Sequence, residues 1–85
     1  MNIQQQKEFI ALYKQYNSTD KAVIKDNLKH YMNKSELKIN EIAGITGIPV
    51  QSLYQLRKPY AEYCPEFIPA IIICDCLGIS VTEII

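Results

Sequence analysis

Residues 39–58 read INEIAGITGIPVQSLYQLRK, and the rest of the chain is organised around this stretch. Its apolar residues recur at helical spacing on both sides of Gly47-Ile48-Pro49. Glycine can adopt the positive φ that ends a helix, and proline is suited to the first turn of the next helix. The stretch therefore predicts two short helices joined by a tight turn.

The side chains of this stretch divide into an inner and an outer set. Ile42, Ala43 and Ile45 form the inner face expected of the first helix, and Leu53 and Leu56 form that of the second. The outer face of the second helix is polar and aromatic, at spacings i, i+3, i+4 and i+7, and comprises Gln51, Tyr54, Gln55 and Lys58. A face of this composition indicates a surface that recognises a partner.

The stretch resembles the helix-turn-helix of the Cro/cI-type (XRE, lambda-repressor-like) family of DNA-binding proteins. The residues that match the family's structural positions are Ala43, Gly47, Ile48, Leu53 and Leu56. The chain also ends in LGISVTEII, residues 77–85, which resembles the family's ending Leu-Gly-Val-Ser-Leu-Asp-Glu-Leu-Leu. The resemblance covers residues 22–85. It implies an all-α, five-helix lambda-repressor-like domain over residues 20–85. The alternative is an ordinary pair of helices in another helical bundle.

The resemblance also implies which side chains contact DNA. Bases in the major groove would be read by Pro49, Val50, Gln51, Tyr54 and Gln55. Glutamine can pair bidentately with adenine, and a tyrosine ring can cover a thymine methyl group. Phosphate contacts, which position the helix without reading sequence, are expected at Lys38, Asn40, Ser52, Arg57 and Lys58.

One residue departs from the family's pattern. The family often has glutamine at the first motif position, where it helps to hold a phosphate, and this chain has Ile39 there. Asn40, or the free N–H groups at the helix start, would have to replace that contact.

Two helices are predicted before this stretch. Residues 2–17 have an amphipathic pattern and form an additional N-terminal helix, which with its linker occupies residues 1–19. Ser18 or Thr19 is expected to cap the next helix, residues 20–33. A row of lysines on that helix indicates a solvated face, or one that lies near a phosphate backbone: Lys21, Lys25 and Lys29.

Two more helices are predicted after it. Residues 66–78 read as a buried helix that ends at Gly78. Pro69 predicts either a kink in its first turns or a start one or two residues later. Ser80 is expected to cap a final short helix, with Glu83 completing a capping box.

The net charge is zero, but the charges are unevenly distributed along the chain. Residues 1–60 contain all nine Lys and Arg and five acidic residues, a balance of +4, whereas residues 61–85 contain four acidic residues and no Lys or Arg, a balance of −4. This asymmetry predicts one face for an anionic partner and another turned away from it.

The composition argues against several other classes of protein. Three cysteines, Cys64, Cys74 and Cys76, are an odd number and favour buried free thiols over disulfides. A C-x-C pair and a single histidine, His30, make a poor zinc site, so no metal or cofactor is expected. We find no Cys–His arrangement, glycine-rich phosphate loop or carboxylate pair typical of an enzyme. Neither a membrane-length apolar run nor a secretory signal is visible, so a cytoplasmic protein is expected.

The sequence therefore predicts a regulator, a prokaryotic or phage-type repressor, that reads double-stranded DNA with helix 50–58. A single reading helix covers few base pairs, so a homodimer is expected. Its contacts would come from the N-terminal helix or from Ile79, Val81, Ile84 and Ile85. The alternative is a protein-interaction module on the same fold, such as an inhibitor or antitoxin-like partner. The neutral charge, Ile39, Pro49 and the single arginine favour that alternative.

Overall fold

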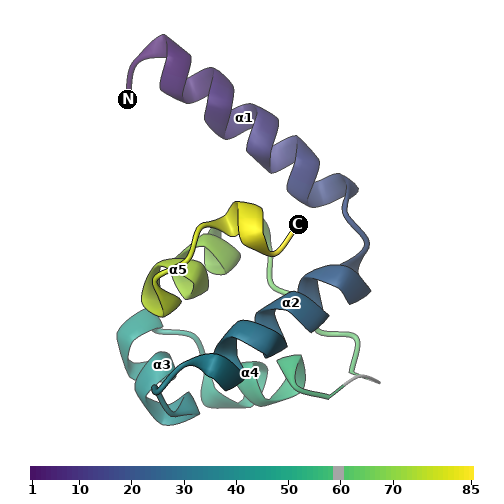
Figure 1. Ribbon diagram of the computed structural model, residues 1–85, viewed down its shortest axis with the longest axis vertical. Coiled ribbons are helices and arrows are strands. Elements are labelled where there is room, and N and C mark those ends of the chain that lie inside the picture. The colour runs from purple at the N-terminus through teal and green to yellow at the C-terminus, as the bar shows by residue number, and fades with distance from the viewer. Residues whose placement is uncertain (59–60) are drawn as a thin grey trace.

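Five α-helices and one 3₁₀ turn make up the computed structural model, which describes residues 1–58 and 61–85 (Figure 1). In chain order they are α1 (Ile3–Ser18), α2 (Lys21–Lys34), α3 (Ile39–Thr46), α4 (Val50–Leu56), α5 (Phe67–Leu77) and η1 (Val81–Glu83). The described residues contain no strand, so the prediction of an all-α chain is confirmed.

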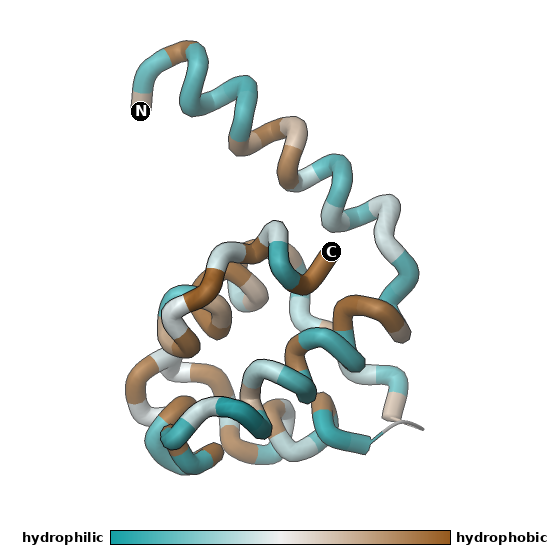
Figure 2. The backbone as a smooth tube through the Cα atoms, viewed as in Figure 1, coloured by the Kyte–Doolittle hydropathy of each residue, from teal (hydrophilic) through white to brown (hydrophobic). Residues whose placement is uncertain are grey.

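A single core lies among α2, α3, α4, α5 and η1, and α1 lies across one end of it (Figure 1). Every element contributes to it, and α5 is apolar over most of its length (Figure 2). The buried side chains are Tyr16, Ile24, Leu28, Met32, Ile39, Ile42, Leu53, Leu56, Phe67, Ala70, Ile73, Cys74, Val81 and Ile84. Because Val81 and Ile84 are buried within their own chain, they do not supply the dimer contact that the sequence suggested.

The turn between α3 and α4 has the predicted left-handed glycine. Gly47 has φ 76° and ψ 4°, and its N–H donates to the Ala43 carbonyl at 2.9 Å, which ends α3. Pro49 is the N-cap of α4 and so lies one position before the first turn, in which the sequence had suggested it. Ile48 and Ala43 are half-buried and pack against the core, as their positions in the motif predict.

A threonine that the sequence pattern did not single out also stabilises this turn. The Thr46 hydroxyl donates to the Ile42 carbonyl at 2.7 Å and accepts from the Ile48 N–H at 3.2 Å. Two backbone groups at the end of α3 are therefore paired through one side chain.

The predicted inner face of α3 is wrong at one residue. Ile45 is 64% exposed, whereas Ile42 is fully buried. The buried face of the helix includes Ile39 and Ile42, three residues apart, and Ile45 lies to one side of it. The contact with α4 and α5 sets this rotation.

The caps of α2 differ from those predicted. Asp20 is the N-cap, and its carboxylate accepts from the Ala22 N–H at 2.8 Å. Ser18 and Thr19 instead donate back to the Lys14 and Gln15 carbonyls, at 2.8 Å each, and satisfy the end of α1. A serine or threonine hydroxyl can either cap the start of the next helix or donate back to a carbonyl one turn earlier. Here both hydroxyls donate back to α1.

The C-terminal elements agree with the sequence in outline. α5 begins at Phe67, so Pro69 is in its first turn, where the missing N–H removes no helical hydrogen bond. Gly78 ends it at φ 72°. Ser80 accepts from the Thr82 N–H at 3.3 Å, but η1 is only a single 3₁₀ turn, and its cap is Ser80 alone, without Glu83.

Gly47→Val should destabilise the fold by about 1–3 kcal/mol, because a β-branched residue is strained at positive φ. A Cβ atom at Gly47 meets no atom within 4 Å, so the cost arises from the backbone alone. Urea denaturation measures the loss of unfolding free energy, which should be smaller for Gly47→Asn than for Gly47→Val.

Gly44→Ala is the matched control, since Gly44 is inside α3 and a Cβ there also meets open space. It should leave stability unchanged or raise it by about 0.5–1 kcal/mol. Equal losses at Gly44 and Gly47 would show that φ at Gly47 is not the constraint.

Candidate nucleic-acid interface

The outer face of α4 is exposed and polar. Gln51, Tyr54 and Gln55 face solvent, with Tyr54 48% exposed, while Leu53 and Leu56 on the other side are 0% and 1% exposed. Two inward leucines three residues apart set the rotation of this seven-residue helix. Three of the five predicted base-reading residues therefore share one open surface.

The other two predicted base-reading residues have different environments. Pro49 is exposed at the N-cap of α4, next to that surface. Val50 is half-buried and packs against the core, so only part of its side chain is free to contact a ligand.

The predicted phosphate-contacting residues surround α4 unevenly. Lys38, Asn40 and Lys58 are exposed. Lys38 is the N-cap of α3, and its N–H donates to the Glu41 carboxylate at 3.0 Å. Ser52 is half-buried, so only part of its side chain is free to contact a phosphate.

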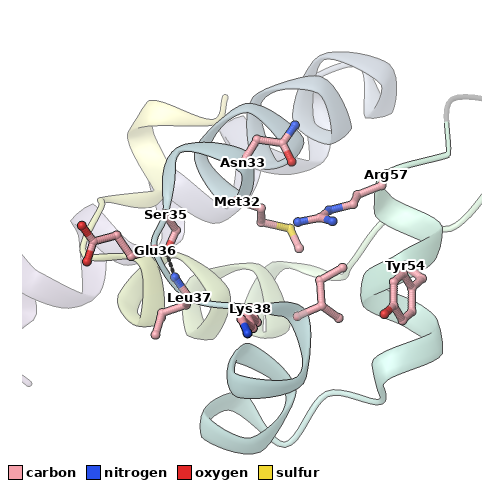
Figure 3. Close-up of a pocket in the computed structure, with 9 residues that line it drawn as sticks. Met32, Asn33, Ser35, Glu36, Leu37, Lys38, Tyr54 and Arg57 are labelled. Carbon is pink, nitrogen blue, oxygen red and sulfur yellow. Dashed lines mark hydrogen bonds between the residues drawn. The ribbon is translucent and has the colours of Figure 1, made fainter.

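Arg57 lies beside an open hollow of about 400 Å³ between the α2–α3 connection and α4 (Figure 3). Its side chain extends from α4 toward Met32, and Tyr54 and Lys38 also line the hollow. The Arg57 Nε atom is buried and has no hydrogen-bond partner among the described residues. Two cations, Lys38 and Arg57, one carboxylate, Glu36, and an aromatic ring therefore line the hollow, a charge balance of +1.

Lys25 is not on a solvated face, which corrects the interpretation of the lysine row. It is 8% exposed, and its Nζ donates to the Lys58 carbonyl at 3.3 Å and to the Ala61 carbonyl. The Lys58 carbonyl also accepts from the Ala61 N–H at 3.1 Å. Lys25 therefore ties the chain that follows α4 to α2, a long-range contact that local spacing could not indicate.

The three cysteine thiols are free, and each is partly or fully buried. Burial raises the pKa of each thiol, that of Cys74 to about 11. A protonated thiol is a poor nucleophile and a poor metal ligand at neutral pH. Within the described residues, no three His, Cys, Asp or Glu side chains are placed to hold a metal ion.

None of the helices in the described part of the chain combines the length and apolarity needed to cross a membrane. Comparisons of the chain with models of protein families, with curated proteins and with solved structures gave no match.

Lys25→Met should destabilise the fold by about 1–3 kcal/mol, because it leaves partly buried carbonyl groups without their donor. Lys21→Met is the matched control on the same helix. Because Lys21 is exposed, this substitution should change the free energy of unfolding by no more than about 0.5 kcal/mol. Chemical denaturation of both variants provides the measurement. Equal values for the two would mean that the Lys25 ammonium makes no net contribution.

Proposed function

We propose that the chain is a sequence-specific DNA-binding transcriptional regulator, a cytoplasmic repressor similar to the Cro/cI-type proteins of prokaryotes and phages. The observation that carries the proposal is the exposed face of α4, with Gln51, Tyr54 and Gln55 presented beside a tight glycine turn. The order α2, α3, α4, α5 and η1 supports a lambda-repressor-like domain in residues 20–85, to which α1 is added.

In this proposal α4 enters the major groove of double-stranded DNA. The groove is wide enough for a helix, and each base pair shows a distinct pattern of donors and acceptors there. Gln51 and Gln55 are one helical turn apart and can each contact a base edge, and Tyr54 lies between them in sequence. Pro49 and the free part of Val50 approach the groove first, at the N-terminus of α4.

Contacts to the phosphates would come from both sides of α4. Arg57 and Lys58 follow the helix, and Lys38 and Asn40 lie at the start of α3. Lys34, in the last turn of α2, is a further cation on the basic part of the chain. The acidic residues 61–85 would be turned away from the DNA.

A gel-shift experiment at low salt tests the proposal, with the DNA upstream of the protein's own gene and an unrelated duplex of equal length. Regulators of this kind often control their own promoters, so a shift of the upstream DNA alone is expected. Failure to bind any duplex at low salt would refute it.

A second candidate function is a protein-interaction module that has this fold but binds no operator. It is favoured by the zero net charge and by the environment of Ile39. This residue is 5% exposed and belongs to the core, so the first motif position offers a DNA phosphate no polar side chain.

Gln51→Ala and Gln55→Ala should each weaken binding to a specific site by about 1–3 kcal/mol, because each removes a base contact. The site can be obtained by selection from random duplexes, and fluorescence anisotropy measures the affinities. Binding to unrelated DNA and the melting temperature should barely change. Gln15→Ala, on the exposed part of α1, is the control and should bind as the wild type does.

The salt dependence of binding should be moderate, because the chain has few cations. If three or four cations in each of two bound chains displace one counterion apiece, log affinity should fall against log salt with a slope of about −5 to −7. Arg57→Ala and Lys58→Ala should lower affinity for all sequences and flatten the slope by about 1 each. Glu62→Gln and Glu83→Gln should have little effect. A slope near zero is incompatible with the phosphate contacts assigned above.

A further inference from the structure

The cations on the two sides of α4 are held in place by different means. Lys38 is the N-cap of α3, so the helix that follows it fixes its backbone. Lys58 lies two residues after the end of α4 and belongs to no helix. Its N–H donates to the Gln55 carbonyl at 3.1 Å, a bond that tightens the last turn of α4. Contacts within α4 therefore fix only the amide side of Lys58.

The carbonyl side of Lys58 is fixed from another helix. This carbonyl accepts from the Lys25 Nζ at 3.3 Å and from the Ala61 N–H at 3.1 Å. The same Nζ also donates to the Ala61 carbonyl. Lys25 is on α2, 33 residues before Lys58. One ammonium group thus joins two residues of the chain that follows α4 to a helix of the core.

The burial of Lys25 makes these bonds costly to break. The residue is 8% exposed, and lysine is almost never buried unless its charge is paired. Because desolvation penalises an ammonium group, the carbonyl oxygens have to replace the water that it loses. Hydrogen bonds from a charged donor are also roughly twice as strong as those between neutral groups. The folded chain therefore gains by keeping the Lys58 and Ala61 carbonyls beside this ammonium group.

Lys25 also lies beside the second cation that follows α4. Lys25, Leu56 and Arg57 line one hollow of about 210 Å³ between α2 and the end of α4. Leu56 is buried in the core, so the end of the helix is fixed where Lys25 can reach the residues that follow it. The Lys25 charge is directed to backbone carbonyls, whereas the side chain of Lys58 is exposed.

We propose that Lys25 is a positioning residue for DNA binding, which holds the backbone of Lys58 so that the Lys58 side chain meets a phosphate when α4 enters the groove. This inference rests on the proposed function. Lys25 acts through Lys58, and neither its own charge nor its effect on stability accounts for that role. A cation that is ordered before binding loses less conformational freedom on binding than a mobile one. Ordering the backbone of one residue corresponds to a factor of about 5 to 30 in affinity.

Amide ¹⁵N relaxation of the full chain without DNA tests the first step. In Lys25→Met, the order parameters of the Lys58 and Ala61 amides should fall from about 0.85 to below about 0.6. Lys25→Gln, which is shorter and polar, gives the same test if methionine prevents folding. Asn27→Ala is the matched control, because it removes another long-range bond of α2, to the Ile84 carbonyl at 3.1 Å. It should leave the Lys58 amide rigid. A Lys58 amide that stays rigid in folded Lys25→Met and Lys25→Gln would overturn the proposal.

A double-mutant cycle on an unrelated duplex at low salt tests the second step, since phosphate contacts do not read sequence. Fluorescence anisotropy should show that Lys25→Met weakens binding about 5- to 30-fold for each bound chain. In a Lys58→Ala background the same substitution should have no further effect, and Asn27→Ala should bind as the wild type does.

An equal loss in both backgrounds would mean that Lys25 acts by its own charge or through stability, and would overturn the proposal. A wild type that binds no duplex would instead refute the proposed function. The relaxation measurement would then still decide whether Lys25 holds Lys58, because it uses no DNA.

Discussion

The left-handed backbone of Gly47 is the constraint on which the rest of the structure depends. It ends α3 after two turns and lets α4 begin three residues later, so that Ile42 and Leu53 meet in the core. Once these leucine and isoleucine side chains are buried, the remaining side of α4 has only solvent to face. The exposed glutamines are therefore a consequence of the turn, and the proposed reading surface depends on its geometry.

A second constraint acts on the far end of α4. The Lys25 side chain is buried, and its ammonium group joins α2 to the carbonyls of Lys58 and Ala61. A buried ammonium group needs such acceptors, because desolvation penalises its charge unless oxygen atoms replace water. Lys58 is held both by its own N–H, which donates to the Gln55 carbonyl at 3.1 Å, and by the bond that its carbonyl accepts from Lys25.

The chain shows two surfaces with opposite character. One is the polar outer face of α4, close to the cations of residues 34–58, and the other is an apolar hollow lined by Phe9, Ile10, Tyr13, Phe67 and Ile68. A substitution in one surface should leave the other unaffected, since additivity holds for sites that share no partners.

Local pattern in the sequence determined the helical class, the glycine turn, the inward leucines of α4 and the helix end at Gly78. These depend on backbone conformation and on spacing within one helix, which nearby residues set by themselves. Tertiary structure alone decided that Ile45 is exposed, that Lys25 is buried, that Asp20 is the cap of α2, and that Val81 and Ile84 are core residues. Each of these depends on which neighbour a side chain meets across the fold. The rotation of α3 is set by α4 and α5, and the acceptors of Lys25 come from residues more than thirty positions away.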